Sequence, residues 1–242
     1  MSIRNLFGLM AAVIFFATFQ ASADVFDHFN DGLLDPAWEI TFENATGWTY
    51  TESGTELVVD DIEMITGPPN GVILKQDFLA PGNFKVKSAL SWDSNDMSSV
   101  LQTIGVRVYS GDVLAVQGGY TDPMLGGAGR RYARIEYPNY TYDGGYEGYS
   151  GTAEITLKRV DGFVSVLWND QVMLTGYSDL AIDKVGLFFG GEYSYDFGAL
   201  SVDYVSAVPT PEPATIVFLF IGSNYLLLKR KRRYTAGSKI LC

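Results

Sequence analysis

The chain has little of the side-chain chemistry that catalysis and metal binding usually require. It contains 242 residues but only one cysteine, Cys242, and one histidine, His28. A single cysteine excludes an internal disulfide, so the fold must be held by a hydrophobic core. One histidine without neighbouring ligands argues against a zinc site and against a hydroxyl nucleophile activated by a histidine base.

Positive charge is also scarce in the body of the chain. Residues 24–206 contain 27 acidic and 10 basic residues, a net charge of −17. No basic stripe is available to neutralise phosphates, so a nucleic-acid partner is not expected. An acidic domain is compatible with calcium binding, or with solubility in a polyanionic or salty environment outside the cell.

The first 23 residues have the three regions of a secretory signal peptide. Arg4 supplies a positive charge, residues 6–19 are almost wholly apolar, and residues 21–23 are small, as a cleavage site requires. An apolar run of about 14 residues is short for a bilayer span, which takes about 20. The chain is therefore expected to be exported, with Asp24 as its first mature residue.

The C-terminal part has the composition of a membrane anchor. A Pro-rich linker at 207–213 leads into an apolar segment at 214–228 and a basic tail at 229–242, which opens with five consecutive cations. Positive charge stays cytoplasmic, so the domain before the linker lies outside the cytoplasm. At 1.5 Å per residue the apolar segment spans roughly 22 Å, which makes it a short transmembrane helix.

Pro211, Glu212 and Pro213, followed by this apolar segment and the basic cluster, resemble the PEP-CTERM sorting signal of exopolysaccharide-producing Gram-negative bacteria. The resemblance implies that an exosortase-type transpeptidase in the membrane recognises and cleaves the tripeptide region. It places the protein in the cell envelope or outside the cell. Residues 234–242 depart from the pattern, since such signals usually end near the arginines. An ordinary C-terminal membrane anchor is the alternative.

The region between the two ends shows strand periodicity and no helical run. Apolar and polar residues alternate at 84–87, and at 200–204 Leu200, Val202 and Tyr204 are expected to share the buried face. Tight turns are expected at 160–163 and 168–171. The expected strands span residues 25–29, 38–42, 47–51, 55–60, 71–78, 84–92, 99–109, 112–120, 130–137, 152–159, 162–169, 171–176, 184–190 and 199–206. The pattern predicts one all-β domain at 24–206, a jelly-roll sandwich of about 12–14 antiparallel strands.

Several of these segments are similar to concanavalin A-like lectin/glucanase domains of the LamG type: the opening at 26–38, the hairpin near 155–174 and the strands at 185–189 and 202–205. The resemblance implies that the first and last strands lie close together and that the middle strands form a concave, often carbohydrate-facing sheet. It also implies a structural calcium ion held by Asp203 with Asp27 or Asp31, because calcium prefers carboxylate and carbonyl oxygens. The residues alone equally allow Asp203 to occupy the wet face of an edge strand.

Catalytic residues are not expected. Glucanases of this superfamily place a Glu-x-Asp-x-x-Glu motif on one strand, so that two carboxylates face the cleft. The nearest segment is 60–63, Asp-Asp-Ile-Glu, in which Asp61 and Glu63 share a face but a third carboxylate in register is missing. The chain is therefore predicted not to be an enzyme.

Tyrosines gather in the segment 132–149, which is also rich in Gly, Asn and Asp. Their rings can stack on the apolar faces of sugars while the hydroxyls stay in water, and neighbouring arginines can pair with acidic sugars. The candidate ligand-binding residues are Tyr137, Tyr140, Tyr142, Tyr146, Arg130 and Arg131. The alternative is a long loop whose tyrosines close one end of the sandwich.

The function predicted from the sequence is that of an exported, non-catalytic cell-surface or extracellular-matrix protein. Its lectin-like domain is expected to bind carbohydrate or exopolysaccharide. Two alternatives stay open: a structural envelope protein without a ligand, and a glycoside hydrolase with a degenerate motif.

Overall fold

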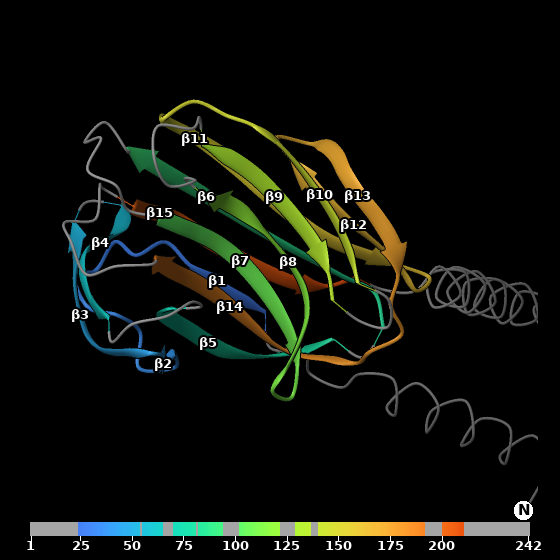
Figure 1. Cartoon of the computed structure of the whole chain (residues 1–242). Coiled ribbons are helices and arrows are strands. Elements are labelled where there is room, and N and C mark those ends of the chain that lie inside the picture. Colours follow the sequence, from blue (N-terminus) through green and yellow to red (C-terminus); the bar gives the residue numbers. More distant parts are fainter. Residues whose placement is uncertain are drawn as a thin grey trace, which may run out of the picture. The chain divides into compact units, whose positions relative to one another are not determined.

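The computed structural model describes residues 24–53, 55–64, 70–80, 82–93, 102–121, 129–136, 140–191 and 200–210. These residues form two antiparallel sheets that pack face to face (Figure 1). The strands are β1 (Val25–Asp27), β2 (Glu39–Glu43), β3 (Ala45–Ser53), β4 (Glu56–Met64), β5 (Asn70–Ala80), β6 (Phe84–Asp93), β7 (Gln102–Ser110), β8 (Val113–Thr121), β9 (Arg130–Ile135), β10 (Thr141–Tyr146), β11 (Ser150–Val160), β12 (Phe163–Trp168), β13 (Gln171–Tyr177), β14 (Ile182–Gly191) and β15 (Leu200–Pro209).

Strands distant in the sequence are neighbours in both sheets. Sheet A has the order β13-β12-β11-β6-β15-β4-β3, with β1 paired to β15, and sheet B has the order β10-β9-β8-β7-β14-β5-β2. The pairing of β1 with β15 confirms that the first and last strands of the domain lie side by side.

The core lies between the sheets and follows the alternation seen in the sequence. In β6, Phe84 and Val86 are fully buried, whereas Lys85 between them is exposed. This layer buries large side chains from both sheets, among them Phe84 of sheet A and Tyr120 and Phe189 of sheet B. Burial of this apolar surface, at roughly 25 cal/mol per Å², is what holds a chain without disulfides.

Both expected tight turns are present. Asp161 and Gly162 join β11 to β12 with φ angles of 52° and 81°, and Asn169 and Asp170 join β12 to β13 with φ angles of 49° and 62°. Positive φ at both central residues gives the turn the twist that a two-residue hairpin needs.

Two expectations about the strands were wrong. The described residues contain fifteen strands rather than 12–14, because β10 lies inside the tyrosine-rich segment that was expected to be a loop. Tyr204 does not share the buried face with Leu200 and Val202. A β-bulge inserts Asp203 between the pairs Val202–Leu90 and Tyr204–Ala89, which moves Tyr204 to the outer face of sheet A.

The two ends of the chain lie mostly outside the described residues. The expected signal peptide at 1–23 and transmembrane segment at 214–228 fall there, as do Pro211, Glu212 and Pro213. Within the described ranges there is no helix long and apolar enough to cross a bilayer. The last strand continues to Pro209, three residues past the expected end of the domain at 206.

Candidate functional site

The outer face of sheet B brings together side chains from seven strands. Successive residues of a strand point to opposite faces, so the residues between the core positions all point away from the core. The register aligns them in three rows across the sheet. The edge row is Tyr146, Arg130, Thr121, Thr103, Gly190, Gly71 and Glu43. The aromatic row is Gly144, Tyr132, Gly119, Gly105, Phe188, Ile73 and Thr41. The cationic row is Tyr142, Arg134, Gln117, Arg107, Gly186, Lys75 and Glu39.

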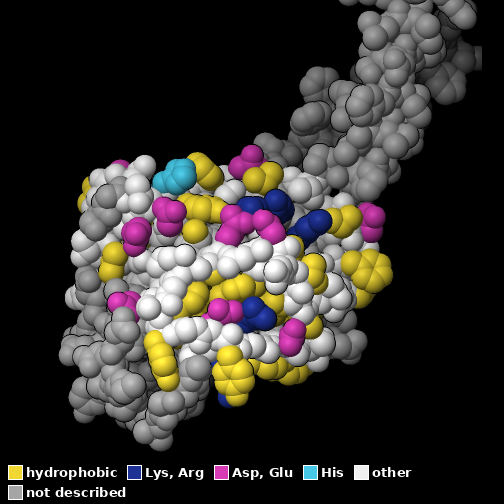
Figure 2. Space-filling view, turned by 90° about the horizontal axis from the view of Figure 1, so that it is seen from above, with side chains coloured by type: hydrophobic (Ala, Val, Ile, Leu, Met, Phe, Trp, Pro, Cys, Tyr) yellow, Lys and Arg dark blue, Asp and Glu magenta, His cyan; other side chains and the backbone are white. Residues whose placement is uncertain are grey.

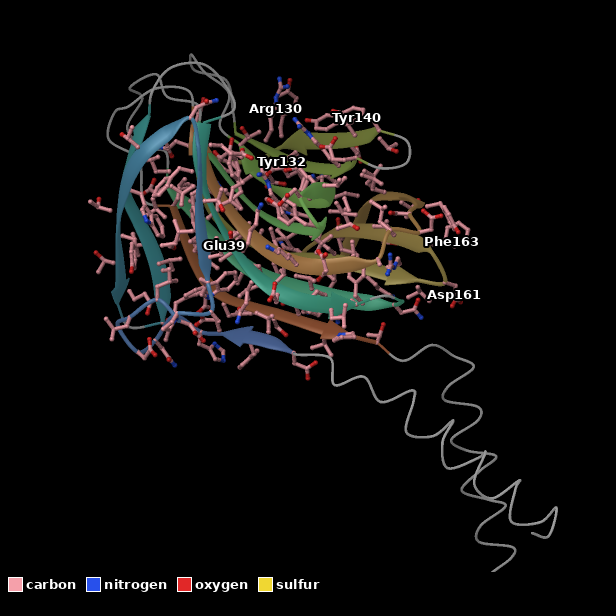
Figure 3. The ribbon with its side chains drawn as sticks, turned by 90° about the horizontal axis from the view of Figure 1, so that it is seen from below. Glu39, Arg130, Tyr132, Tyr140, Asp161 and Phe163 are labelled. Carbon is pink, nitrogen blue, oxygen red and sulfur yellow. The ribbon has the colours of Figure 1, made fainter. Side chains whose placement is uncertain are left out.

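Three aromatic rings lie against glycines on this face. A Cβ added at Gly105 would collide with the hydroxyl oxygen of Tyr132, two strands away. A Cβ at Gly71 would stand 2.6 Å from Phe188, and one at Gly186 would stand 3.0 Å from Tyr109. Only glycine, which has no Cβ, leaves room for these rings to pack flat against the backbone of the neighbouring strand. Three aromatic rings therefore cover part of this face. Figure 3 shows Tyr132 between Arg130 and Glu39.

Cations lie over these rings. The guanidinium carbon of Arg107 is 3.6 Å from the ring centroid of Phe188, and that of Arg134 is 5.8 Å from Tyr132 and 5.6 Å from Tyr142. The Nζ atom of Lys75 is 4.8 Å from the Tyr109 centroid. Such cation–π contacts fix the long side chains in place.

A chain of hydrogen bonds crosses the cationic row. Arg107 Nε donates to Gln117 Oε1 at 3.1 Å, and Gln117 Nε2 donates to Glu136 Oε1 at 3.0 Å. Gln117 is therefore held in one orientation between a donor and an acceptor. The terminal nitrogens of Arg107 and Arg134 stand 4.0 Å from Glu43 and Glu136, beyond hydrogen-bond distance.

The hydroxyl of Tyr132 is buried in the middle of this arrangement and has no hydrogen-bond partner among the described residues. Burial raises its pKa above the ordinary value, and the positive charges of Arg107 and Arg134 oppose that rise. The group thus stays protonated near neutral pH and offers an unused donor beside two guanidinium groups.

The tyrosine-rich segment contributes to this face only in part. Arg130, Tyr142 and Tyr146 lie on it, and the guanidinium carbon of Arg130 is 5.1 Å from the Tyr146 centroid. Arg131 points to the opposite side of β9, where Nη1 pairs with Glu147 Oε1 at 3.0 Å. Tyr140 is exposed directly before β10.

Tyr137 lies outside the described residues. The sequence reasoning missed residues of the face on four other strands: Lys75 on β5, Arg107 and Tyr109 on β7, Gln117 on β8 and Phe188 on β14. Their signal was available in β7, where Thr, Gly, Arg and Tyr alternate with core residues over 103–109. Only the strand order shows that these positions adjoin the tyrosine-rich segment.

Of the row positions on this face, only those of β2 carry carboxylates. Glu39 and Glu43 lie on β2, and Glu136 follows β9, whereas the row positions on β7, β8 and β14 carry none. The segment 60–63 belongs to β4 in sheet A, so it lies in the other sheet.

Asp27 and Asp203, the expected calcium ligands, lie near the β1–β15 pairing. Asp27 accepts hydrogen bonds from Phe29 N at 2.8 Å and from Trp38 Nε1 at 2.7 Å, and Asp203 is the half-buried extra residue of the bulge. In the part of the chain that the structure describes, no group of three or more acidic, histidine or cysteine side chains is placed to hold a metal ion.

Comparison with known proteins supports the fold alone. No family model and no curated protein sequence matches the chain. Its structure is similar to that of the CBM2 module of the evolved Dit of Lactobacillus casei BL23 phage J-1, with 6% identity, a TM-score of 0.59, and coverage of 77% of this chain and 96% of that one. It is also similar to an endo-β-1,3-glucanase from Pyrococcus furiosus, with 11% identity, a TM-score of 0.55, and coverage of 76% and 92%.

A third similar structure is a pseudo β-1,3-glucanase of Mycobacterium tuberculosis, with 9% identity, a TM-score of 0.51, and coverage of 77% of this chain and 98% of that one. The chain thus shares the β-sandwich of glucanase-type proteins. Because one of these neighbours is named a glucanase and another a pseudo-glucanase, the fold does not decide whether the chain is catalytic.

Proposed function

We propose that this chain is an exported, non-catalytic surface or matrix protein whose sandwich binds carbohydrate on the outer face of sheet B. The observation that carries the proposal is the pair of exposed tyrosines, Tyr142 and Tyr146, beside the buried rings of Tyr132, Phe188 and Tyr109, each of which lies against a glycine. The exposed rings, with the guanidinium groups of Arg130 and Arg134 next to them, match the alternating apolar and polar surfaces of a sugar. The likeness to glucanase-type folds is compatible with this use of the sheet.

The non-catalytic part of the proposal rests on the placement of carboxylates. A retaining glycosidase needs two carboxyl groups about 5 Å apart across the scissile bond, and an inverting one needs them about 6.5–9.5 Å apart. The described face places Glu39 and Glu43 on the edge strand β2, and it places the Glu136 carboxylate beside Gln117, next to an Arg–Gln–Arg set.

Export and sorting rest on the sequence. The signal peptide at 1–23 delivers the domain across the membrane, and Pro211, Glu212 and Pro213 with the following apolar and basic segments form a PEP-CTERM-type signal for an exosortase. Expression of the full chain with and without an exosortase tests this step. Loss of the C-terminal segment only in its presence is expected, and an unchanged mass in both strains would contradict it.

The binding proposal is tested with the full chain in a detergent that lacks a sugar headgroup. A panel of neutral and acidic polysaccharides is immobilised, and retention of wild type is compared with Tyr142→Ala and Tyr146→Ala. Both tyrosines are exposed on the face, and Tyr177 on β13 is an equally exposed ring in sheet A. Tyr177→Ala is the matched control and should bind like wild type.

Retention lost in the first two variants and kept in the third supports the proposal. If no polysaccharide is retained, the structural envelope protein is the better account. Release of reducing sugar from a bound glucan would instead favour a hydrolase.

A further inference from the structure

Positive charge recurs on every second strand of the cationic row. Arg134 lies on β9, Arg107 on β7 and Lys75 on β5, with Gln117 and Gly186 between them. Neighbouring strands are about 4.8 Å apart, so successive cations are based roughly 10 Å apart across the sheet.

This row contains donors that the protein leaves unused. The Nε atom of Arg134 is buried and has no hydrogen-bond partner among the described residues. Arg107 uses Nε on Gln117, and its Nη1 atom stands 4.0 Å from Glu43, beyond hydrogen-bond distance. The buried hydroxyl of Tyr132 is a third unused donor. Buried donors without acceptors destabilise a protein, so a ligand that supplies acceptors at this place gains what the free protein lacks.

The surroundings of the Tyr132 hydroxyl select for negative charge. The positive groups that bear on it are Arg107 and Arg134, and Glu43 and Glu136 stand 4.0 Å from these guanidinium groups, beyond hydrogen-bond distance. Guanidinium groups bind carboxylate and sulfate oxygens through two parallel hydrogen bonds, which a neutral sugar hydroxyl does not provide.

The cationic row contrasts with the rest of the domain, whose net charge is −17 over residues 24–206. The face that carries His28 mixes acidic and basic side chains (Figure 2). At 0.15 M salt the Debye length is about 8 Å, so acidic residues beyond that distance are largely screened, whereas Glu43 and Glu136, 4.0 Å from Arg107 and Arg134, are not. An acidic ligand therefore has to make contacts with Arg107, Arg134 and Lys75 that outweigh the repulsion from these two carboxylates.

We infer that the carbohydrate bound by sheet B is an acidic polysaccharide whose carboxylate or sulfate groups lie on Arg107 and Arg134 beside the Tyr132 hydroxyl. This inference rests on the proposed function and names the class of its sugar. The chain of the glycan runs across the strands along the cationic row, so that a further acidic group meets Lys75. Exposed Tyr142, at the end of the row, supplies a ring for an adjoining sugar.

The experiment compares glycans that differ only in charge. The full chain, in a detergent without sugar, is titrated at pH 7 and 0.15 M NaCl with polygalacturonate and its fully methyl-esterified form, and with dextran sulfate and dextran. We expect the charged member of at least one pair to bind at least tenfold more tightly. Preference within the first pair identifies a carboxylate, and preference within the second identifies a sulfate.

Substitutions in the cationic row test whether its residues cause the preference for charged glycans. Arg134→Gln and Lys75→Gln should each weaken binding of the charged glycan about tenfold, equivalent to about 1.4 kcal/mol, and weaken binding of the neutral partner less. The matched control is the double variant Lys85→Gln with Lys158→Gln, a pair of exposed lysines facing each other on β6 and β11 of sheet A. Melting temperatures within a few degrees of wild type show that each variant is folded.

Three results would overturn the inference. Equal binding of the neutral and charged members leaves carbohydrate binding in place but removes the preference for acid. Equal weakening by the sheet A double variant, or equal affinity for single-stranded DNA, shows an unspecific response to charge. Retention of no glycan at all would contradict both this inference and the proposed function.

Discussion

The hydroxyl oxygen of Tyr132 on β9 occupies the space that a Cβ of residue 105 on β7 would fill. The tyrosine side chain therefore spans β8 and rests on the third strand, above Gly105. This contact ties the exposed tyrosine-rich edge of sheet B to its central strands. The position of the buried hydroxyl thus depends on a glycine that touches no ligand itself.

Gly105→Ala should force Tyr132 off the sheet. Overpacking of this kind costs about 1–3 kcal/mol, which denaturant unfolding measures. In the double variant with Tyr132→Phe the nearest ring atom, Cζ, is 3.4 Å from the new Cβ, so part of the loss should return. A coupling free energy of at least 0.5 kcal/mol between the two substitutions is expected. Strict additivity would show that the two residues do not meet.

Tyr132→Phe alone should separate stability from binding. Its hydroxyl is buried without a partner among the described residues, so its removal should leave the free energy of unfolding unchanged or slightly higher. Binding of an acidic glycan should weaken, because a donor is lost from the site. A variant that is destabilised by more than about 1 kcal/mol would reveal that the hydroxyl has an acceptor in the folded protein.

Glu52 on β3 should make stability fall as pH rises. Both of its carboxylate oxygens are shielded from solvent. Burial, the contact with the Asp31 carboxyl and the charge of Asp27 raise the pKa of Glu52 from 4.5 to about 7. The fold thus favours the protonated form, so this contribution is complete below about pH 4.5 and is lost as pH rises through about 7.

The measurement for Glu52 is the melting temperature of wild type and Glu52→Gln from pH 5 to 8.5. The difference, wild type minus variant, should decrease across this range, since glutamine cannot ionise. Asp112→Asn, at an exposed turn position, serves as the control and should follow wild type. Parallel curves for wild type and Glu52→Gln would refute the prediction.

Introducing a glycine in one hairpin turn and removing one from the other should change the free energy of unfolding in opposite directions. Asp170 has a φ of 62°, where glycine is less strained, so Asp170→Gly should raise the free energy of unfolding by roughly 0.5 kcal/mol. Gly162 has a φ of 81° and stands where a Cβ would be 2.5 Å from Tyr177, so Gly162→Ala should lower it by about 1–2 kcal/mol. Chemical denaturation of both variants decides, and a stabilised Gly162→Ala would contradict the turn geometry.

Local patterns predicted most of the strands because alternation and turn residues are properties of neighbouring positions. The strand β10 escaped because Thr141–Tyr146 combines tyrosines with Asp and two glycines, a composition typical of loops. Tyr204 was assigned to the wrong face because a single inserted residue, Asp203, reverses the alternation beyond it, and no local signal marks such a bulge.

The candidate site was predicted only where it coincides with a conspicuous cluster in the sequence. Arg130, Tyr142 and Tyr146 were found through the crowding of tyrosines, whereas Arg131 was grouped with them although it faces the other way. Arg107 and Phe188 join the site through the β9-β8-β7-β14 order, which depends on long-range pairing. The alternation of apolar and polar residues predicts the face of the sheet on which a side chain lies. Its neighbours on adjacent strands depend on the order of the strands in the sheet, which local patterns do not give.

The last strand of the domain lies in the interior of sheet A, between β6 and β4, and also pairs with β1. It pairs with β6 from Leu200 to Pro209, the point at which the chain leaves the sandwich. Hydrogen bonds between antiparallel strands run perpendicular to them, so a force applied at Pro209 along β15 loads the whole ladder in shear. When the domain is pulled from this end, many hydrogen bonds of the ladder carry the force at the same time. If β15 were an edge strand pulled perpendicular to its length, its hydrogen bonds would break one after another at a lower force.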